Sequence, residues 1–453
     1  MTRVAVVGGG PAGLAAAYRL TTDGVQTAVF EAGPSIGGLA RSMDMWGHAV
    51  DLGAHMFTLK DPRVSRMWTE LVGSDYDSAP RRTRVLFDRW SLPYPFDPLE
   101  ATRAVGVAEA VRCGTSLAVG RLARRRVGGD LESWVVGRFG RRAFELFFAS
   151  YVEKLFGAPA REIDGAFAQT LLGFQPQRSL PRRPRSGSAS PTVLVRPFRG
   201  IGVLVERLGE HIRARGGEVR CDAPVARLRT AGDRVVGVDL QSGETREIDA
   251  VVSALPVALT ARLVADDRHL GQKPPRFRSV VLVYLLVDAE TTFRDQWVFM
   301  APRRFKGSRV TNFGSWSPAG RDGGQTVLSV EFWCDRSDAL WSAADDDLRE
   351  LAVGELGGAG LLQPQAVRDS QVVRLRDAFP VPVVGYSDVL AATAARLSRF
   401  ANLKVTGGLG AISSAGVHGS LVAGIEAGDA VRRALSLNGA PSSSISAGSG
   451  GGA

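Results

Sequence analysis

Three glycines near the start of the chain constrain its fold more than any other feature. Gly8, Gly10 and Gly13 have G-x-G-x-x-G spacing, and they follow a valine-rich run that predicts a buried parallel strand. The Ala/Leu-rich segment after them predicts a helix. In such a turn the first glycine allows the tight bend, the second lets the backbone approach a pyrophosphate, and the third lets the helix pack closely on the strand. The start of the helix offers unpaired N–H groups to the phosphates.

A second strand and an acidic residue follow at the distance that this motif requires. Residues 26–30 predict a strand that ends at Glu31, about 20 residues after the glycines, where a carboxylate can hold ribose hydroxyls. The alternative is a glycine-rich turn in another kind of α/β protein. Because strand, turn, helix, strand and acid all occur in order, the sequence favours an adenine dinucleotide site.

Length and composition set broad limits. The 453 residues give room for two domains or one two-lobed unit, and 45% hydrophobic with 23% charged residues is typical of a globular protein. No run of eighteen apolar residues predicts a transmembrane helix, and the glycine turn lies where a signal peptide would have its apolar core. We therefore expect a cytoplasmic protein. The three cysteines and five histidines lack metal-ligand spacing, so we expect no metal.

The net charge of +10 comes almost entirely from arginine. Three clusters carry much of it: Arg81, Arg82 and Arg84; Arg121, Arg124, Arg125 and Arg126; and Arg178, Arg182, Arg183 and Arg185. The first interpretation is a solvated surface, and the second is attraction of an anionic substrate or an acidic membrane surface. We expect no nucleic-acid partner, because no recognised nucleic-acid module accompanies the charge.

Two later stretches resemble FAD enzymes of the glutathione-reductase-like superfamily, amine-oxidase branch. Residues 31–41 resemble the "E-x-x-x-x-x-G-G-x-x-x-S/T" segment that crosses the cofactor pyrophosphate, with Arg41 adding charge. Residues 51–57 resemble the "D-x-G-x-H-x-F" turn beside the isoalloxazine ring. The resemblance implies non-covalently bound FAD rather than NAD.

Over nearly the whole chain the sequence is similar to the UDP-galactopyranose mutase and protoporphyrinogen-oxidase-like group. Residues 151–157, 308–318, 379–386 and 407–421 carry this resemblance. It implies an α/β protein with a glutathione-reductase-like Rossmann FAD domain and an α+β substrate domain, formed by a helical lobe and a mainly antiparallel sheet. The expected FAD domain comprises residues 1–60, 197–262 and 395–436, and the substrate domain residues 61–196 and 263–394. Residues 437–453 are expected to form a disordered tail.

Local patterns predict the elements of the substrate domain. Residues 61–173 predict helices, interrupted by an extended segment at 89–96, and strands are expected at 280–287, 297–301, 309–316 and 326–333. The Pro/Arg/Ser-rich stretch 176–197 predicts a loop that is either a linker or a substrate lid.

The resemblance implies a set of cofactor-binding residues. They are Gly8, Gly10, Pro11, Ala12, Gly13, Glu31, Ala32, Gly38, Leu39, Arg41, Gly53, His55, Val225, Gly407, Val417 and His418.

Three residues are catalytic candidates, each with a structural alternative. His55 is either a proton relay beside the flavin N5 position or a residue that holds its turn in place. His418 has a weaker case for a substrate or flavin role. Arg309 is either an anion clamp or half of a surface ion pair. Glu153 and Lys154 are expected to form a structural or substrate-orienting pair.

The sequence departs from the mutases where they bind a diphosphate. They carry an arginine where this chain has Gly408, a tyrosine where Ser413 and Ser414 stand, and a further arginine in the region of residues 166–171. Only Arg309 is retained, and a bidentate arginine cannot be replaced by glycine or leucine without losing the charge-assisted bonds that hold a diphosphate.

These departures rank the possible functions. The preferred hypothesis is a two-electron oxidation or desaturation of a small sugar-containing or anionic metabolite, with a nucleotide sugar among the candidates. The alternatives are redox-neutral pyranose/furanose isomerisation of a nucleotide sugar through reduced flavin, and flavin binding without turnover. Peripheral membrane contact stays open.

Overall fold

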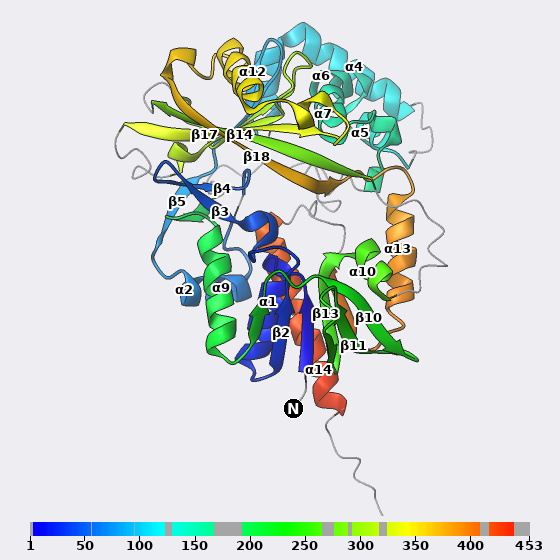
Figure 1. The fold of residues 1–453 in the computed structure, drawn as a ribbon. Helices are drawn as coiled ribbons and strands as arrows, with labels where there is room; N and C mark the ends of the chain where they lie inside the picture. Colours follow the sequence, from blue (N-terminus) through cyan, green and yellow to red (C-terminus); the bar gives the residue numbers. More distant parts are fainter. Residues whose placement is uncertain are drawn as a thin grey trace, which may run out of the picture.

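The computed structural model contains two main layers of sheet, one above the other in Figure 1. It describes residues 3–55, 57–94, 96–122, 129–166, 193–264, 276–288, 292–316, 324–407 and 416–438. The sequence-based expectations for Gly408, Ser413, Ser414, residues 167–192 and residues 439–453 therefore lie outside the described residues. A five-stranded parallel sheet forms the lower unit, and a seven-stranded mixed sheet forms the upper one.

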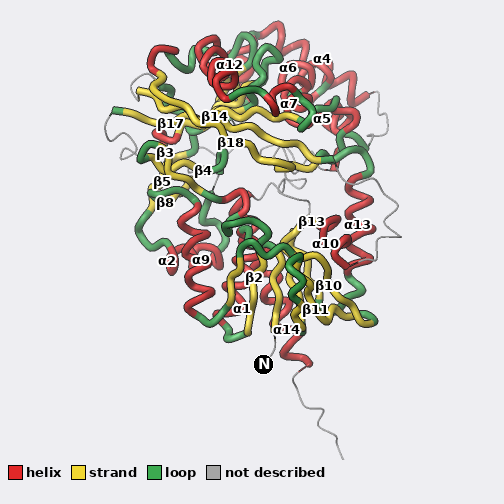
Figure 2. Tube along the Cα trace, viewed as in Figure 1, coloured by secondary structure: helices red, strands yellow, loops and turns green. Residues whose placement is uncertain are grey.

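The parallel sheet collects strands from distant parts of the chain. Its order is β19-β13-β1-β2-β9, with bounds Leu403–Gly407, Ala250–Pro256, Arg3–Val7, Gln26–Phe30 and Glu218–Arg220. Helices α1 (Pro11–Thr22), α9 (Gly202–Ala214) and α14 (Gly416–Asn438) belong to this unit. Figure 2 shows the helices alongside the strands. Nearly every residue of β1 is buried, which is why its sequence is a continuous apolar run rather than an alternating one.

The first and last helices of this unit pack with almost no space between them. A Cβ placed on Gly424 of α14 would lie 2.1 Å from the carbonyl oxygen of Ala12, and one on Gly428 would lie 3.0 Å from that of Ala16. Only glycine permits this approach. The contact holds α14 against the start of α1, next to the glycine turn.

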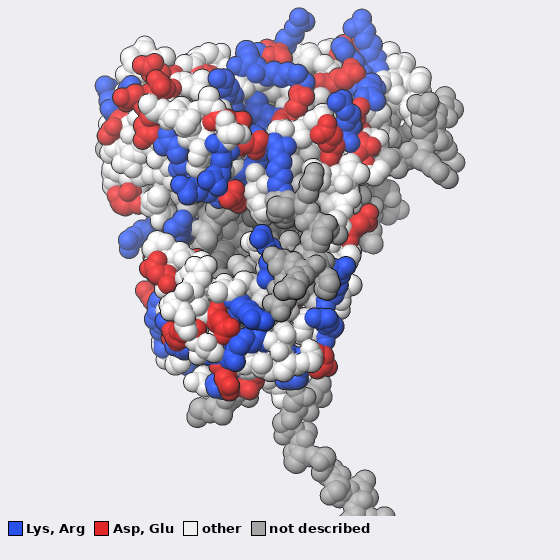
Figure 3. Space-filling model, turned by 45° about the vertical axis from the view of Figure 1, so that its right-hand side comes forward, with Lys and Arg blue, Asp and Glu red and all other residues white. Residues whose placement is uncertain are grey.

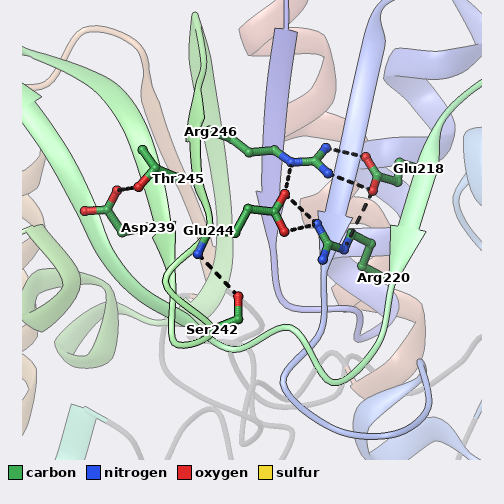
Figure 4. Close-up of polar contacts among 7 residues, drawn as sticks. All are labelled: Glu218, Arg220, Asp239, Ser242, Glu244, Thr245 and Arg246. Carbon is green, nitrogen blue, oxygen red and sulfur yellow. Dashed lines mark hydrogen bonds and ion pairs between the residues drawn. The ribbon is translucent and has the colours of Figure 1, made fainter.

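A small antiparallel sheet stands beside the parallel one. It has the order β10-β11-β12, with bounds Val225–Ala231, Arg234–Leu240 and Thr245–Glu247. Figure 4 shows how side chains join it to the edge strand β9: Arg220 and Arg246 both donate to Glu244, and Arg246 also donates to Glu218. The charges alternate around this ring, and it supplements an apolar cluster in which Val7 and Phe30 of the parallel sheet pack with Val238 and Leu240 of the small sheet.

The upper sheet has the order β18-β14-β17-β16-β15-β6-β7. Its strands are Val367–Pro380, Phe277–Asp288, Gln325–Cys334, Arg309–Asn312, Trp297–Met300, Thr83–Leu86 and Ser91–Pro93. Only the β15–β6 pair is parallel. This is the mainly antiparallel sheet that the resemblance implied.

Strand β14 is buried on both faces because each face has its own partner. The odd-numbered residues from Val281 to Val287 pack with helix α12 (Asp345–Gly358), and the even-numbered ones from Val280 to Leu286 pack with residues of the β3–β4 hairpin. Strands β3 and β4 are Ser42–Met45 and His48–Asp51. The second face of the upper sheet therefore looks toward the lower unit.

Helices complete the molecule. They are α2 (Pro62–Leu71), α3 (Pro98–Val105), α4 (Val107–Leu122), α5 (Leu131–Phe139), α6 (Arg141–Phe147), α7 (Ala149–Phe156), α10 (Val257–Val264), α11 (Ala339–Ser342) and α13 (Tyr386–Leu397). Figure 1 shows α12 above the upper sheet and α4–α7 grouped at one end of it. Helix α12 packs on the face that contains Val298 and Met300, whereas Tyr151 of α7 packs on Phe299, which points to the opposite face.

Three expectations about local structure are wrong. The segment expected to be helical contains two strands, β5 (Tyr76–Pro80) and β6, and the expected loop ends in strand β8 (Val193–Pro197). Strand β7 lies in the segment 89–96 that was expected to be extended, so that expectation is confirmed. Strand β5 pairs with β8, and β6 pairs with β15. Helix α14 also continues to Asn438, into the segment expected to be a disordered tail.

A buried ion pair joins the β4 strand to the segment that enters α9. Arg196 donates from Nε to Asp51 Oδ2 at 2.9 Å and from Nη2 to the Ala49 carbonyl at 2.7 Å. The other Asp51 oxygen accepts the Ser42 hydroxyl and the Ile201 N–H. Burial alone would raise the pKa of Asp51, but Arg196 and these hydrogen bonds outweigh it and hold the pKa below its usual range.

Candidate functional site

The glycine turn has the geometry that a pyrophosphate site needs. Gly8 has a φ of +100°, and a Cβ on Gly13 would lie 1.9 Å from the Gly8 carbonyl oxygen. By contrast, a Cβ on Gly10 would meet no described atom within 4 Å. Pro11 opens α1, and neither it nor Ala12 adds a negative charge to the helix start. The turn is therefore closed toward the protein at Gly13 and open toward solvent at Gly10.

Glu31 is tied to the same turn. Its Oε2 accepts the Gly9 N–H at 2.7 Å, and its Oε1 accepts the Gly33 N–H at 2.8 Å. Each oxygen keeps a second lone pair that can accept a ribose hydroxyl. The Ala223 N–H donates to the Glu31 carbonyl, which brings the start of β10 at Val225 close to this carboxylate.

The second glycine pair faces the first. The Gly37 N–H donates to the Gly9 carbonyl at 2.7 Å, and a Cβ on Gly38 would lie 3.6 Å from the Gly10 Cα. Arg41 folds over this turn, because its Nε donates to the Gly38 carbonyl at 2.9 Å. The two turns and the guanidinium form a cradle in which an added side chain would take the place of a ligand. Ala32 and Leu39 flank it, and Gly407 ends the strand β19.

The contacts of His418 indicate a structural role. It lies in the first turn of α14 beside the buried Val417, and its ring centroid is 5.9 Å from that of Phe57. Burial lowers its pKa, against a hydrogen bond to the Thr58 backbone that raises it. These contacts are with the segment after the Gly53–His55 turn, and they favour a packing role over the catalytic role predicted for His418.

His55 lies between the cradle and the upper sheet. Its Nε2 is 2.9 Å from the Leu39 carbonyl, so we assign the proton to Nε2 and the free lone pair to Nδ1. Burial lowers the pKa of His55, with the Arg309 charge acting in the same direction and Asp51 opposing it. The ring is therefore neutral near pH 7.

Arg309 is paired with a residue that sequence reasoning missed. Its Nε and Nη2 donate to the two carboxylate oxygens of Glu331, each at 2.9 Å. The Glu331 side chain is only 2% exposed, and a Cβ on Gly53 would lie 3.2 Å from its Oε1. This pair stands directly over the Gly53–His55 turn. The sequence signal that could have identified Glu331 is its position as a carboxylate in the middle of an otherwise apolar strand.

Three aromatic rings, those of Phe299, Tyr151 and Tyr94, lie next to Arg309, and together they are called the aromatic wall. Phe299 is the centre: its ring lies 5.7 Å from Tyr151 and 6.0 Å from Tyr94, and the Arg309 guanidinium carbon lies 5.9 Å from it. Burial raises the pKa of Tyr151 and of Tyr94, so both phenols stay protonated and can donate hydrogen bonds. All three rings are partly exposed, and Phe299 is the one residue of β15 that is not buried.

Glu153 and Lys154 do not pair with each other in the structure. Lys154 Nζ donates to the carbonyls of Met300, Pro302 and Gly307 at 2.6, 3.1 and 3.0 Å. Glu153 instead pairs with Arg303. Both residues fix the loop between β15 and β16, which positions Arg309.

Many of the described arginines are paired with carboxylates. Figure 3 shows acidic and basic side chains interspersed over the face in view. No group of three or more His, Cys, Asp or Glu residues suited to a metal ion occurs in the described part of the chain. Within the same ranges, no helix is long and apolar enough to cross a membrane.

The cradle and the fold together define a class of protein. A parallel sheet with the glycine turn at the carboxyl end of its first strand, a ribose-type carboxylate and a second glycine turn over the first fits FAD, and the residues above would hold its adenosine and pyrophosphate. The chain matches the family of flavin-containing amine oxidoreductases over residues 11–435, and it belongs to that family. It is therefore a FAD-binding flavoenzyme of the oxidoreductase type.

Relatives and solved structures agree with this assignment. The chain is 28% identical over 430 residues to coproporphyrinogen III oxidase of Mycobacterium leprae (strain TN), covering 86% of this chain and 90% of the relative. It is 27% identical over 419 residues to the protein of the same name from Mycobacterium tuberculosis (strain H37Rv), covering 85% and 88%.

Among solved structures, reduced UDP-galactopyranose mutase gives a TM-score of 0.78 at 20% identity, covering 96% of both chains. A putative protoporphyrinogen oxidase from Exiguobacterium sp. 255-15 gives 0.70 at 17%, covering 96% of this chain and 98% of that one. These likenesses confirm the fold expected from the sequence.

Proposed function

We propose that the chain catalyses a two-electron oxidation or desaturation of a small anionic metabolite. When bound, FAD supplies the chemistry by accepting two electrons from the substrate. The protein's part is to hold the substrate against the flavin edge and to exclude water. In this proposal Phe299, Tyr94 and Tyr151 form the wall on which the substrate lies, and the neutral His55 accepts its proton at Nδ1.

The pairing of Arg309 with Glu331 is the observation that carries the choice of reaction. A diphosphate clamp needs a guanidinium whose paired N–H groups are free, because a bidentate contact supplies most of the binding. In this chain the Nε and Nη2 groups of Arg309 already donate hydrogen bonds to the buried Glu331 carboxylate. Next to it stands a wall of aromatic rings, which suits an apolar body better than a sugar diphosphate.

The test compares the two reactions on the same flavin-loaded protein. In one arm, candidate substrates are mixed anaerobically with the oxidised protein, beginning with coproporphyrinogen III, and loss of the main visible flavin band is followed. In the other arm, dithionite-reduced protein is incubated with UDP-galactopyranose and the furanose product is sought by chromatography.

We expect flavin reduction by an oxidisable anionic substrate and no furanose. Efficient furanose formation would show that the mutase reaction is the correct one. Flavin that stays oxidised with every substrate, in a protein that also makes no furanose, would favour flavin binding without turnover. Gly10→Val protein, which lacks the pyrophosphate site, is the control for free flavin in either arm.

A further inference from the structure

Arg81 has no carboxylate partner among the residues that the structure describes. It belongs to the first arginine cluster of the sequence, yet its surroundings differ from those of its neighbours. Arg82 is exposed, and Arg84 pairs with Asp295 at 3.4 Å. Arg81 is partly buried, its Nε donates to the Thr83 hydroxyl at 3.3 Å, and no carboxylate among the described residues pairs with it. Burial lowers its pKa.

Such a group is costly unless an anion meets it. Charged side chains taken out of water are almost always paired, because the desolvation penalty is otherwise not recovered. An unpaired guanidinium beside a substrate wall is the usual arrangement for a ligand that brings its own negative charge.

Ring contacts connect Arg81 to the wall of the proposed substrate site. Its guanidinium carbon lies 5.2 Å from the Tyr94 ring centroid, and that ring lies 6.0 Å from Phe299. Strand pairing explains the approach: β6 runs parallel to β15 with Val85 opposite Phe299, and the Tyr94 N–H donates to the Thr83 carbonyl at 2.8 Å.

The two ends of this wall therefore differ in charge. At the end near His55, Arg309 is neutralised by Glu331. At the other end, the Arg81 guanidinium, which stays protonated as arginine does in proteins, has no carboxylate partner among the described residues. A ligand with a flat apolar body and one terminal anion matches this polarity, with its rings on Phe299 and Tyr94 and its anion on Arg81.

We propose that Arg81 anchors the carboxylate of an aromatic or conjugated substrate, whose ring system lies along Tyr94 and Phe299 toward the flavin. This inference rests on the proposed function and adds the substrate class to it. Arg81 sets which end of the substrate faces the flavin, because the carboxylate can bind only at the end away from Glu331.

The experiment uses benzoate as the probe, with benzamide as the neutral compound of the same shape. Calorimetric titration of the flavin-loaded protein measures both affinities, and the flavin difference spectrum reports whether the probe lies near the ring. We expect benzoate to bind at least tenfold more tightly than benzamide. Arg81→Met should weaken benzoate about tenfold to a hundredfold and leave benzamide unchanged, because only the anion loses a charge-assisted contact.

Two further variants distinguish the contribution of the bidentate guanidinium geometry from a general effect of mutation on folding. Arg81→Lys keeps the charge without the bidentate geometry and should give an intermediate affinity. Arg84→Met is the matched control from the same cluster and should bind benzoate normally. FAD content and melting temperature are recorded for each variant, so that a misfolded protein is recognised.

The inference is overturned if Arg81→Met binds benzoate as the wild type does, or if benzamide binds equally well. Inorganic phosphate that binds as tightly as benzoate, and with the same dependence on Arg81, would also contradict it, since the ring would then add nothing. Calorimetry detects probe binding with or without flavin. Loss of FAD or of flavin reduction therefore bears on the proposed function, and loss of Arg81-dependent binding bears on this inference.

Discussion

Replacing Arg309 and replacing Glu331 should lower the free energy of unfolding by different amounts, and the two effects should not be additive. Arg309→Met leaves the Glu331 carboxylate 2% exposed, with the Ala54 N–H at 3.4 Å as its nearest remaining donor, beyond ordinary hydrogen-bond length. A buried charge left without its partner costs about 3–5 kcal/mol. Glu331→Gln leaves Arg309, whose side chain is 26% exposed and can turn toward water, so the cost is about 1–3 kcal/mol.

The double variant removes both charges from the site. It leaves only a glutamine amide to satisfy, at a cost of about 1–3 kcal/mol, so the sum of the two single effects should exceed the double effect by about 3–5 kcal/mol. Urea unfolding of flavin-loaded protein, followed by circular dichroism and by flavin fluorescence, measures these differences where the two transitions coincide.

Arg368→Met is the control, because Arg368 forms an exposed pair with Asp288 and its loss should change stability by under about 1 kcal/mol. Additive single effects, or an Arg309→Met protein as stable as the control, would refute the view that Arg309 is held by a buried counter-charge. In that case Arg309 would be free to clamp an anion, and the mutase reaction would regain support.

Three further predictions concern the cofactor site, the domain junction and pH. Gly10→Val should abolish FAD binding while the apoprotein keeps its melting temperature, whereas Gly13→Val should unfold the protein, because its side chain would overlap the Gly8 carbonyl; absorbance and calorimetry check both. Arg196→Met should cost about 3–5 kcal/mol by leaving Asp51 as an unpaired buried charge, and a midpoint shift in urea typical of a surface variant would contradict this. Burial lowers the pKa of His418, so the unfolded state binds its proton first and stability should fall as pH drops below about 6.5; His418→Gln should flatten that slope between about pH 7 and 5.5, and stability that rises on acidification would be the opposite sign.

Local motifs in the sequence predicted the cofactor cradle well. The glycine turn, Glu31 and the second glycine pair are set by residues that lie within about forty positions of one another, so their geometry depends on short-range constraints. Their roles toward FAD stay predictions residue by residue, as do the division into domains and the cytoplasmic location.

Contacts between distant segments could not be predicted in the same way. Strands β5 and β6 carry polar and basic residues and become strands because β8 and β15 pair with them from far along the chain. The pairing of Arg309 with Glu331 depends on the register between β16 and β17, which no local pattern reveals. The lack of a carboxylate partner for Arg81 among the described residues also could not be inferred without knowing which carboxylates lie near it.

The order of the parallel sheet has a consequence for biosynthesis. Strand β1 lies at its centre, but β19 and α14, which cover one edge of β13 and one side of α1, come after all other described elements. On the ribosome the glycine turn is made first, yet the groove into which α14 fits stays uncovered until residue 438 has emerged. A nascent chain that stops before Leu403 exposes that apolar groove and the open strand edge, which are targets for chaperones and proteases.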